Sequence, residues 1–220
     1  MNIFKTLLEL SGRCMLGVAA IGFLSLLGSP AKARERVVNI AMEDQFRNRR
    51  ETGVMQGDVV VLVYAERKGS EAGQALGRKL HVQFHPTAEQ ATAADWSRQP
   101  VVGIPGWPAA IRVPDVHVVP VACLPEVPKP LQAVARSRFR TDSPAVSVWL
   151  DFDDTMRRTF GMVPAAPNVV LLDTHGQMYS MLSGHFDDVK YKDLVSMIDF
   201  LRRQAHPDLR TASTTIPIVR

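Results

Sequence analysis

Apolar and β-branched residues gather in six short stretches separated by polar, glycine-rich or proline-rich sequence. The clearest is residues 59–65, VVVLVYA, whose uninterrupted apolar run is typical of a strand covered on both faces. Residues 169–172 and 177–182 flank the turn sequence DTHG and predict a β-hairpin. The six predicted strands are residues 37–42, 59–65, 116–122, 145–150, 169–172 and 177–182.

Apolar residues recur at helical spacing between and after these strands. Residues 70–84 carry one at every fourth position, namely Ala72, Leu76, Leu80 and Phe84. Ser70 is a natural N-cap for this helix, and Pro86 stops it. Three further helices are predicted at residues 131–139, 156–160 and 191–205.

The order of these elements predicts an α/β fold, with a central mixed sheet flanked by helices. Residues 86–115 contain five prolines and little periodicity, so we expect an irregular, proline-rich insertion packed by Trp96 and Trp107. Residues 43–57 are predicted to be a polar connection. Pro120 predicts a bend or a less central position for the strand at 116–122.

The first 33 residues have the layout of a cleavable signal peptide. Lys5 and Arg13 precede an apolar run at residues 15–27, and small residues follow in an A-x-A pattern that ends at Ala33. This run is shorter than the roughly 20 residues of a membrane-spanning helix. We therefore expect an exported protein, periplasmic or secreted, with a domain at residues 34–206 and a loose tail at 207–220. The alternative is that the first 33 residues are not cleaved and remain as a membrane anchor. Only in that case do we expect a membrane as a partner.

Cleavage changes the charge and the cysteine count. The chain has 26 basic and 22 acidic residues, and the leader removes three basic residues and one acidic residue. A net charge of +4 thus falls to +2, which gives no reason to expect a nucleic acid as a partner. Cys14 leaves with the leader, and the one remaining cysteine, Cys123, cannot form an internal disulfide.

Two segments resemble the thioredoxin-like superfamily, on its peroxiredoxin and membrane-anchored-thioredoxin side. The first is Gly57-Asp58, the strand at 59–65 and the helix that opens at Ser70. The second runs from Phe160-Gly161-Met162 through Ala166-Pro167-Asn168 into an apolar strand and the turn at 173–176. The resemblance spans about residues 37–205. It implies that Pro167 is a cis-proline and that Ala166 and Pro167 line the groove where the family holds extended peptides.

The chain departs from the family where the chemistry would be. Redox members carry Cys-x-x-Cys between this strand and this helix, and here the sequence is ERKGSE, without sulfur. The resemblance therefore implies the fold without dithiol exchange. We expect a non-catalytic, redox-inactive module without a cofactor that binds a protein or peptide in the cell envelope. An accessory role in an envelope complex, with the insertion as its surface, is a further option. Arg67, Lys68 and Ser70 could hold an anion or peptide carboxylate; alternatively, Ser70 is only a cap and both cations are solvated.

Three other patterns leave enzymatic or metal-binding alternatives open. Cys123 could be the thiol of a single-thiol oxidoreductase, or small buried filler. The sequence Asp151-Phe152-Asp153-Asp154-Thr155 resembles the first motif of haloacid dehalogenase-type phosphatases. The resemblance implies that Asp151 is a nucleophile and Asp153 an acid that act with Mg²⁺. The alternative is that these acidic residues cap a short helix. His81 and His85 have the spacing of a zinc half-site followed by Glu89, but Pro86 breaks the helix, so no metal is expected. His175 and His185 have no obvious nucleophile to serve.

Overall fold

The computed structural model describes residues 37–206. The predicted signal peptide at 1–33 and the predicted tail at 207–220 lie outside the described residues. Within residues 37–206, none of the helices has the length and apolarity that crossing a bilayer requires.

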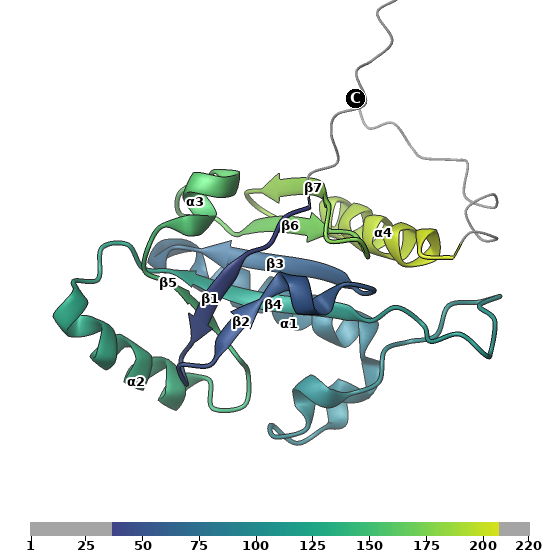
Figure 1. The fold of residues 1–220 in the computed structure, drawn as a ribbon, viewed down its shortest axis with the longest axis horizontal. Coiled ribbons are helices and arrows are strands. Elements are labelled where there is room, and N and C mark those ends of the chain that lie inside the picture. Colours follow the sequence, from purple (N-terminus) through teal and green to yellow (C-terminus); the bar gives the residue numbers. More distant parts are fainter. Residues whose placement is uncertain (1–36, 207–220) are drawn as a thin grey trace, which may run out of the picture. The chain divides into compact units, whose positions relative to one another are not determined.

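The described residues form a mixed sheet of seven strands in the order β2-β1-β5-β4-β3-β6-β7 (Figure 1). Strands β5, β4 and β3 are parallel to one another, and the remaining pairs are antiparallel. The strands are β1 (Ala41–Asp44), β2 (Arg49–Glu51), β3 (Val59–Ala65), β4 (Val116–Cys123), β5 (Trp149–Asp151), β6 (Asn168–Leu172) and β7 (Met178–Ser183). Every residue of β3 is buried, as its unbroken apolar sequence predicts.

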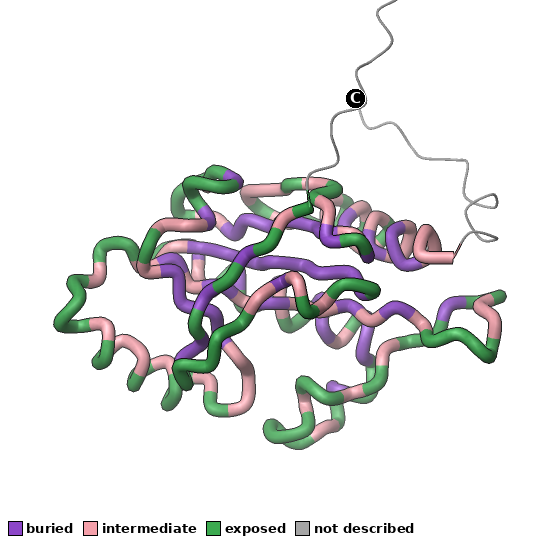
Figure 2. The backbone as a smooth tube through the Cα atoms, in the orientation of Figure 1, coloured by how far each residue is buried: buried purple, intermediate pink, exposed green. Residues whose placement is uncertain are grey.

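Four α-helices accompany the sheet: α1 (Ser70–Phe84), α2 (Gln132–Asp142), α3 (Thr155–Phe160) and α4 (Asp188–Gln204). Helices α1 and α4 cover one face, where Leu80 and Leu194 pack with Val61. Helix α3 and the segment that enters β1 cover the other face, where Met156 and Ile40 are buried. Strands β3, β5 and β6 and the inner sides of α1 and α4 are therefore buried, whereas the edge strands β2 and β7 and helix α2 are not (Figure 2).

The arrangement of strands and helices is that of the thioredoxin-like fold. Strand β3, helix α1 and strand β4 form a parallel β-α-β unit, and β6, β7 and α4 form an antiparallel hairpin followed by a helix. The two units join through the antiparallel β3–β6 pair, which gives the order β4-β3-β6-β7. The α/β prediction and the thioredoxin-like fold are confirmed. Strands β5, β1 and β2 extend the sheet beyond β4.

Strand β2 is missing from the sequence prediction, which made residues 43–57 a polar connection. The hairpin β1–β2 is organised by the buried carboxylate of Asp44. It accepts hydrogen bonds from the backbone N–H groups of Phe46 and Asn48, each at 2.9 Å, and pairs with Arg50 Nε at 2.9 Å. Burial raises the pKa of Asp44, but these hydrogen bonds outweigh it and the pKa is lowered overall.

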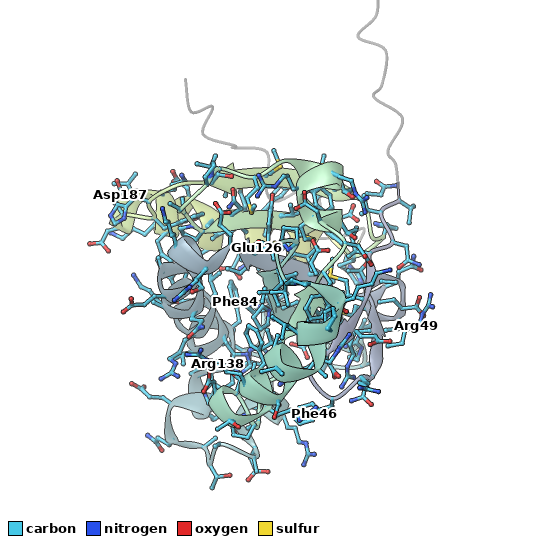
Figure 3. The ribbon with its side chains drawn as sticks, turned by 90° about the vertical axis from the view of Figure 1, so that its left-hand side faces the viewer. Phe46, Arg49, Phe84, Glu126, Arg138 and Asp187 are labelled. Atoms are coloured by element: carbon cyan, nitrogen blue, oxygen red, sulfur yellow. The ribbon has the colours of Figure 1, made fainter. Side chains whose placement is uncertain are left out.

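Helix α2 adjoins this hairpin without burying any of its own residues. Arg136 donates to the carbonyl oxygen of Asp44 at 3.0 Å, and Arg140 donates to that of Gln45 at 3.2 Å. Figure 3 views the domain from this side, with Arg138 on α2 and Phe46 at the tip of the hairpin. Hydrogen bonds from arginine, rather than an apolar stripe, attach α2 to the domain.

Residues 86–115 are irregular, as the prolines predict, with short 3₁₀ turns at Pro86–Gln90 and Trp96–Arg98. Strand β4 follows them and lies inside the sheet, between β3 and β5. Its Pro120 pairs with Val63 of β3, while β5 pairs with β4 only from Val121 onward. Pro120 thus lies where β4 has a neighbouring strand on one side, which suits a residue without an N–H group.

Candidate functional site

The turn between β3 and α1 is where redox members of this fold carry their cysteines. Here Arg67–Gly69 form a 3₁₀ turn that leads directly into the helix, and Gly69 is the N-cap. The prediction that Ser70 caps the helix is wrong, because Ser70 already has helical dihedrals of −64° and −40°. Its hydroxyl donates back to the carbonyl oxygen of Arg67 at 2.8 Å. This local hydrogen bond closes the turn.

The turn packs directly on the loop that precedes β6. A Cβ atom placed on Gly69 would lie 2.7 Å from the carbonyl carbon and oxygen of Ala166, which is backbone and cannot move aside like a side chain. Glu66 Oε1 accepts a hydrogen bond from the N–H of Ala165 at 3.2 Å, and Glu66 also pairs with Arg157 at 3.5 Å. The turn therefore contacts the facing loop through backbone packing and a hydrogen bond, and it contacts α3 through an ion pair.

Pro167 does not have the geometry that the resemblance implied. Residues 37–206 contain no cis peptide bond, so the Ala166–Pro167 bond is trans and the expected cis-proline is wrong. The cis and trans forms of such a bond differ by only about 0.5–1 kcal/mol, so the surrounding loop decides between them. This loop turns through left-handed Gly161 and Ala165, with φ of 75° and 57°. Pro167 is buried and lies 3.9 Å from the Cβ position of Gly73.

The side chain of Asn168 holds this loop in place. Its Oδ1 accepts from the N–H of Val163 at 2.8 Å, and its Nδ2 donates to the carbonyl oxygens of Val163 and Ala166 at 3.2 and 3.0 Å. The carbonyl of Ala166 and the N–H of Ala165 are thus engaged within the domain. The groove expected along Ala166 and Pro167 is occupied by these internal contacts, with Pro167 beneath the surface.

An exposed rim remains around the two loops. The side chains of Arg67 and Lys68 are exposed, and within residues 37–206 neither forms an ion pair. Ser70 lies in the same turn, and Val163 on the facing loop is 48% exposed. The structure therefore brings Arg67, Lys68 and Ser70 together beside Ala166, at one end of α1. We call Arg67, Lys68 and Val163 the basic rim.

Cys123 lies at the end of β4 and is 1% exposed. Burial raises the pKa of its thiol to about 12, and the negative charge of Asp151 acts in the same direction. The thiolate is the form that attacks disulfides, and at neutral pH this thiol keeps its proton. The placement is that of buried filler and does not fit an exposed reactive thiol.

Asp151 at the end of β5 caps the short helix α3. Its two carboxylate oxygens accept hydrogen bonds from the N–H groups of Thr155 and Met156, each at 2.8 Å. Asp151 is 1% exposed, whereas Asp153 is exposed. The capping alternative is the one that this geometry supports, and Asp151 is engaged with backbone rather than directed at a phosphoryl group.

His81 and His85 are both buried and stack on each other with ring centroids 4.3 Å apart. His81 Nε2 faces the carbonyl oxygen of Trp96 at 2.8 Å, and His85 Nε2 faces Asp115 Oδ1 at 2.8 Å. Glu89 is exposed on the turn that follows. Sequence reasoning found the two histidines but missed Asp115, because a partner thirty positions away in irregular sequence gives no local signal.

No protein-family model and no curated protein sequence matches this chain. Similar solved structures include the pneumococcal exposed lipoprotein thioredoxin (Etrx1) from Streptococcus pneumoniae, with 13% identity and a TM-score of 0.47 over 73% of this chain and 98% of that one.

Two further structures are similar. A thiol:disulfide interchange protein DsbE from Chlorobium tepidum has 17% identity and a TM-score of 0.43 over 74% of this chain and 93% of that one. A secreted thiol-disulfide isomerase from Corynebacterium glutamicum has 12% identity and a TM-score of 0.47 over 77% and 84%. Likenesses of this degree say nothing about the chemistry of this chain. What it shares with these proteins is the thioredoxin-like fold that its strand order defines.

Proposed function

We propose that this chain is an exported, redox-inactive domain of thioredoxin-like fold that binds a protein segment in the cell envelope without changing it chemically. The observation that carries the proposal is the contact of Gly69 with the backbone of Ala166. At the position where redox members present a reactive thiol, this chain has a glycine closed against the neighbouring loop. The turn is thereby a fixed part of the surface rather than a reaction centre.

The properties of the thiols support the lack of disulfide exchange. Exchange begins with attack by an accessible thiolate, and a second cysteine usually resolves the mixed disulfide. Cys123 is buried with a raised pKa, and Cys14 lies within the predicted leader. The alternative of a single-thiol oxidoreductase requires Cys123 to be accessible, and its 1% exposure argues against that.

The basic rim is the surface that we propose for binding. Arg67 and Lys68 are exposed cations without an ion pair in the described part of the chain, and Val163 adds an exposed apolar side chain on the facing loop. A partner segment with a carboxylate beside an apolar residue complements this surface. The buried Pro167 takes no part in this binding surface, and Ala166 contributes to it only by packing behind the basic rim.

A binding experiment with matched charge changes tests this proposal. The exported protein is immobilised and incubated with envelope extract at low salt, and retained proteins are identified. We expect a discrete partner that the Arg67→Glu/Lys68→Glu variant loses. The control variant Lys129→Glu/Arg138→Glu makes the same change in net charge on exposed residues of the α2 region and should retain the partner. Equal capture of the partner by both variants would exclude the basic rim as the binding site.

The redox part of the proposal has its own test. The protein is assayed for reduction of insulin disulfides with dithiothreitol as the electron source, beside its Cys123→Ser variant. We expect no rate above the uncatalysed background for either protein. A rate that depends on Cys123 would overturn redox inactivity and favour the single-thiol alternative.

Export rests on residues 1–33 and is tested separately. The full chain is expressed with its own leader, the cells are fractionated, and the N-terminus of the accumulated protein is sequenced. We expect soluble protein in the periplasm or medium that begins at Arg34. Protein that stays in the membrane fraction with Met1 intact would establish the anchored alternative.

A further inference from the structure

Two buried histidines, His81 on α1 and His85 at its C-cap, hold the insertion at residues 86–115 against the helix. The ring of Trp96 packs on that of His81 with centroids 3.9 Å apart, and His81 Nε2 lies 2.8 Å from the carbonyl oxygen of Trp96. His85 Nε2 lies 2.8 Å from Asp115 Oδ1, at the far end of the insertion. His81 and His85 are 7% and 3% exposed. Both the middle and the end of the insertion are thus attached through imidazole nitrogens.

Both ring nitrogens of His85 face an oxygen. Its Nδ1 lies 3.1 Å from the carbonyl oxygen of His81, and its Nε2 lies 2.8 Å from Asp115 Oδ1. Asp115 is thus the carboxylate of the histidine pair, and it is engaged by His85.

The ring of His81 has a different partner. Its Nε2 donates to the carbonyl oxygen of Trp96, and its ring is stacked on the ring of His85 at 4.3 Å. Burial lowers the pKa of His81, and a charge on His85 lowers it as well, against the raising effect of the Trp96 carbonyl and of Asp115. A protonated His81 would have to share Asp115 with His85.

The strands beside the pair supply no second carboxylate for His81. Asp58, which precedes β3, pairs with Arg112 of the insertion at 2.7 Å and faces His117 Nε2 of β4 at 3.0 Å. The same carboxylate accepts the backbone N–H of Asp115 at 2.7 Å. Asp58 is therefore already committed to other donors.

Helix α4 adds a cation to the same region. The buried guanidinium of Arg202 donates to the carbonyl oxygens of Pro114 and Val102 at 3.0 and 2.6 Å, and its partner Asp199 lies 3.5 Å away on the same helix. Arg50 lines the hollow beside the histidines and is paired with Asp44. The charged groups around His81 thus leave an added proton without a counter-ion of its own.

We propose that His81 is a proton sensor: protonation of its ring releases the middle of the insertion, around Trp96, from α1 when the pH falls below neutral. The direction follows from linkage. A histidine whose pKa is lowered in the closed state binds its proton better in the open state, so the closed state weakens as the pH falls below about 6.5. Because the insertion buries few apolar residues, among them Ala88 and Ile104, its opening is a local event.

Release changes an accessible surface. Trp96 and Ser97 of the insertion form one wall of a hollow of about 210 Å³, and His81 and His85 lie in it with the first half of β4. Opening the insertion removes that wall and uncovers the end of α1 and the adjoining strand. The proposal is independent of the basic rim, which lies at the other end of α1.

Hydrogen exchange on the full chain tests the sensor. Amide protection is measured at pH 7.5 and pH 5.5 after correction for the intrinsic exchange rate. We expect protection of the residues around Trp96 to fall at the lower pH, because the closed state loses stability as His81 takes up a proton, while β6 stays unchanged. Equal protection of the insertion at both pH values would overturn the proposal.

Two variants and a titration sharpen the test. His81→Gln keeps an N–H donor for the Trp96 carbonyl but takes no proton, so it should lose the pH dependence. His185→Gln changes an exposed histidine and should retain it. If His81→Gln does not fold, an NMR titration of the His81 ring in the unmodified protein tests the proposal instead. A midpoint at or above the ordinary 6.5, or unchanged pH dependence in His81→Gln, refutes the sensor.

Discussion

Gly69 lies against the backbone of Ala166, and a Cβ atom on Gly69 would approach that carbonyl carbon and oxygen to 2.7 Å. The φ of Gly69 is −97°, so the site excludes larger residues by contact and not by backbone conformation. The two loops that meet here are the ones that would frame a reactive thiol in a redox member of the fold. Their contact makes the residue at position 69 critical for packing.

We expect Gly69→Ala to destabilise the domain by about 1–3 kcal/mol, which is typical of overpacking against atoms that cannot give way. Gly77→Ala is the matched control, because the nearest atom to its added Cβ is Val118 Cγ1 at 3.8 Å, an ordinary contact. In a helix interior that change should be neutral or gain up to about 1 kcal/mol. Urea unfolding of the two variants measures the difference. Equal stability of both would show that the loops separate easily.

The elements that the sequence predicted best are those whose cause is local. Residues 59–65 form β3 as their unbroken apolar run predicts, and the capping role of Asp151 involves residues four and five positions away. Strand β2 has the sequence RRE and no apolar pattern. Its pairing with β1 and the hydrogen bond from Arg50 to Asp44 hold it in place, not burial of its side chains. Such a strand is visible only once the fold is known.

The candidate site was predicted less completely, for a physical reason. The missing sulfur in residues 66–71 is a property of the sequence and was found there. The isomer of the Ala166–Pro167 bond depends on an energy difference of about 1 kcal/mol or less, which the loop around Asn168 decides. The pairing of His85 with Asp115 depends on how an irregular segment returns to the sheet. Neither leaves a pattern in the chain.

Cys123 makes stability depend on alkaline pH. Its pKa is raised from 9.0 to about 12 in the folded state, so the unfolded chain loses the thiol proton first. The free energy of unfolding should therefore fall as the pH rises from about 9 toward 12, and Cys123 should contribute no pH dependence below 9. Cys123→Ala lacks this contribution, although it keeps that of Tyr64, whose pKa is also raised to about 12. Urea unfolding at pH 8 and pH 10 should show the steeper loss in the unmodified protein.

The same burial predicts the reactivity of the thiol. A chromogenic thiol reagent at neutral pH should label the native protein only at the rate of unfolding, because Cys123 is 1% exposed. Full labelling is expected after addition of urea. Rapid labelling of the native protein would contradict the buried placement and revive the single-thiol alternative.

Asp151 should matter for stability and not for hydrolysis. Asp151→Asn leaves one acceptor oxygen for two backbone N–H groups, so we expect a loss of about 1–3 kcal/mol. Asp153→Asn, at an exposed position in the same sequence, should be neutral. Both variants are also assayed with p-nitrophenyl phosphate and Mg²⁺. Hydrolysis that Asp153→Asn abolishes would favour the phosphatase alternative over capping.

Arg202 should be irreplaceable even by lysine. Its guanidinium is 1% exposed and donates from two nitrogens to the carbonyl oxygens of Pro114 and Val102, which lie at two points of the insertion. A lysine has a single nitrogen and cannot reproduce the planar fork that reaches both oxygens. Arg202→Lys should therefore leave one buried carbonyl unsatisfied and cost about 1–3 kcal/mol. Arg203→Lys, on the half-buried next position, should change stability little. Because the lost hydrogen bond anchors residues 86–115, hydrogen exchange in Arg202→Lys should rise first in that segment; a uniform rise across the sheet would show that Arg202 supports the whole core instead.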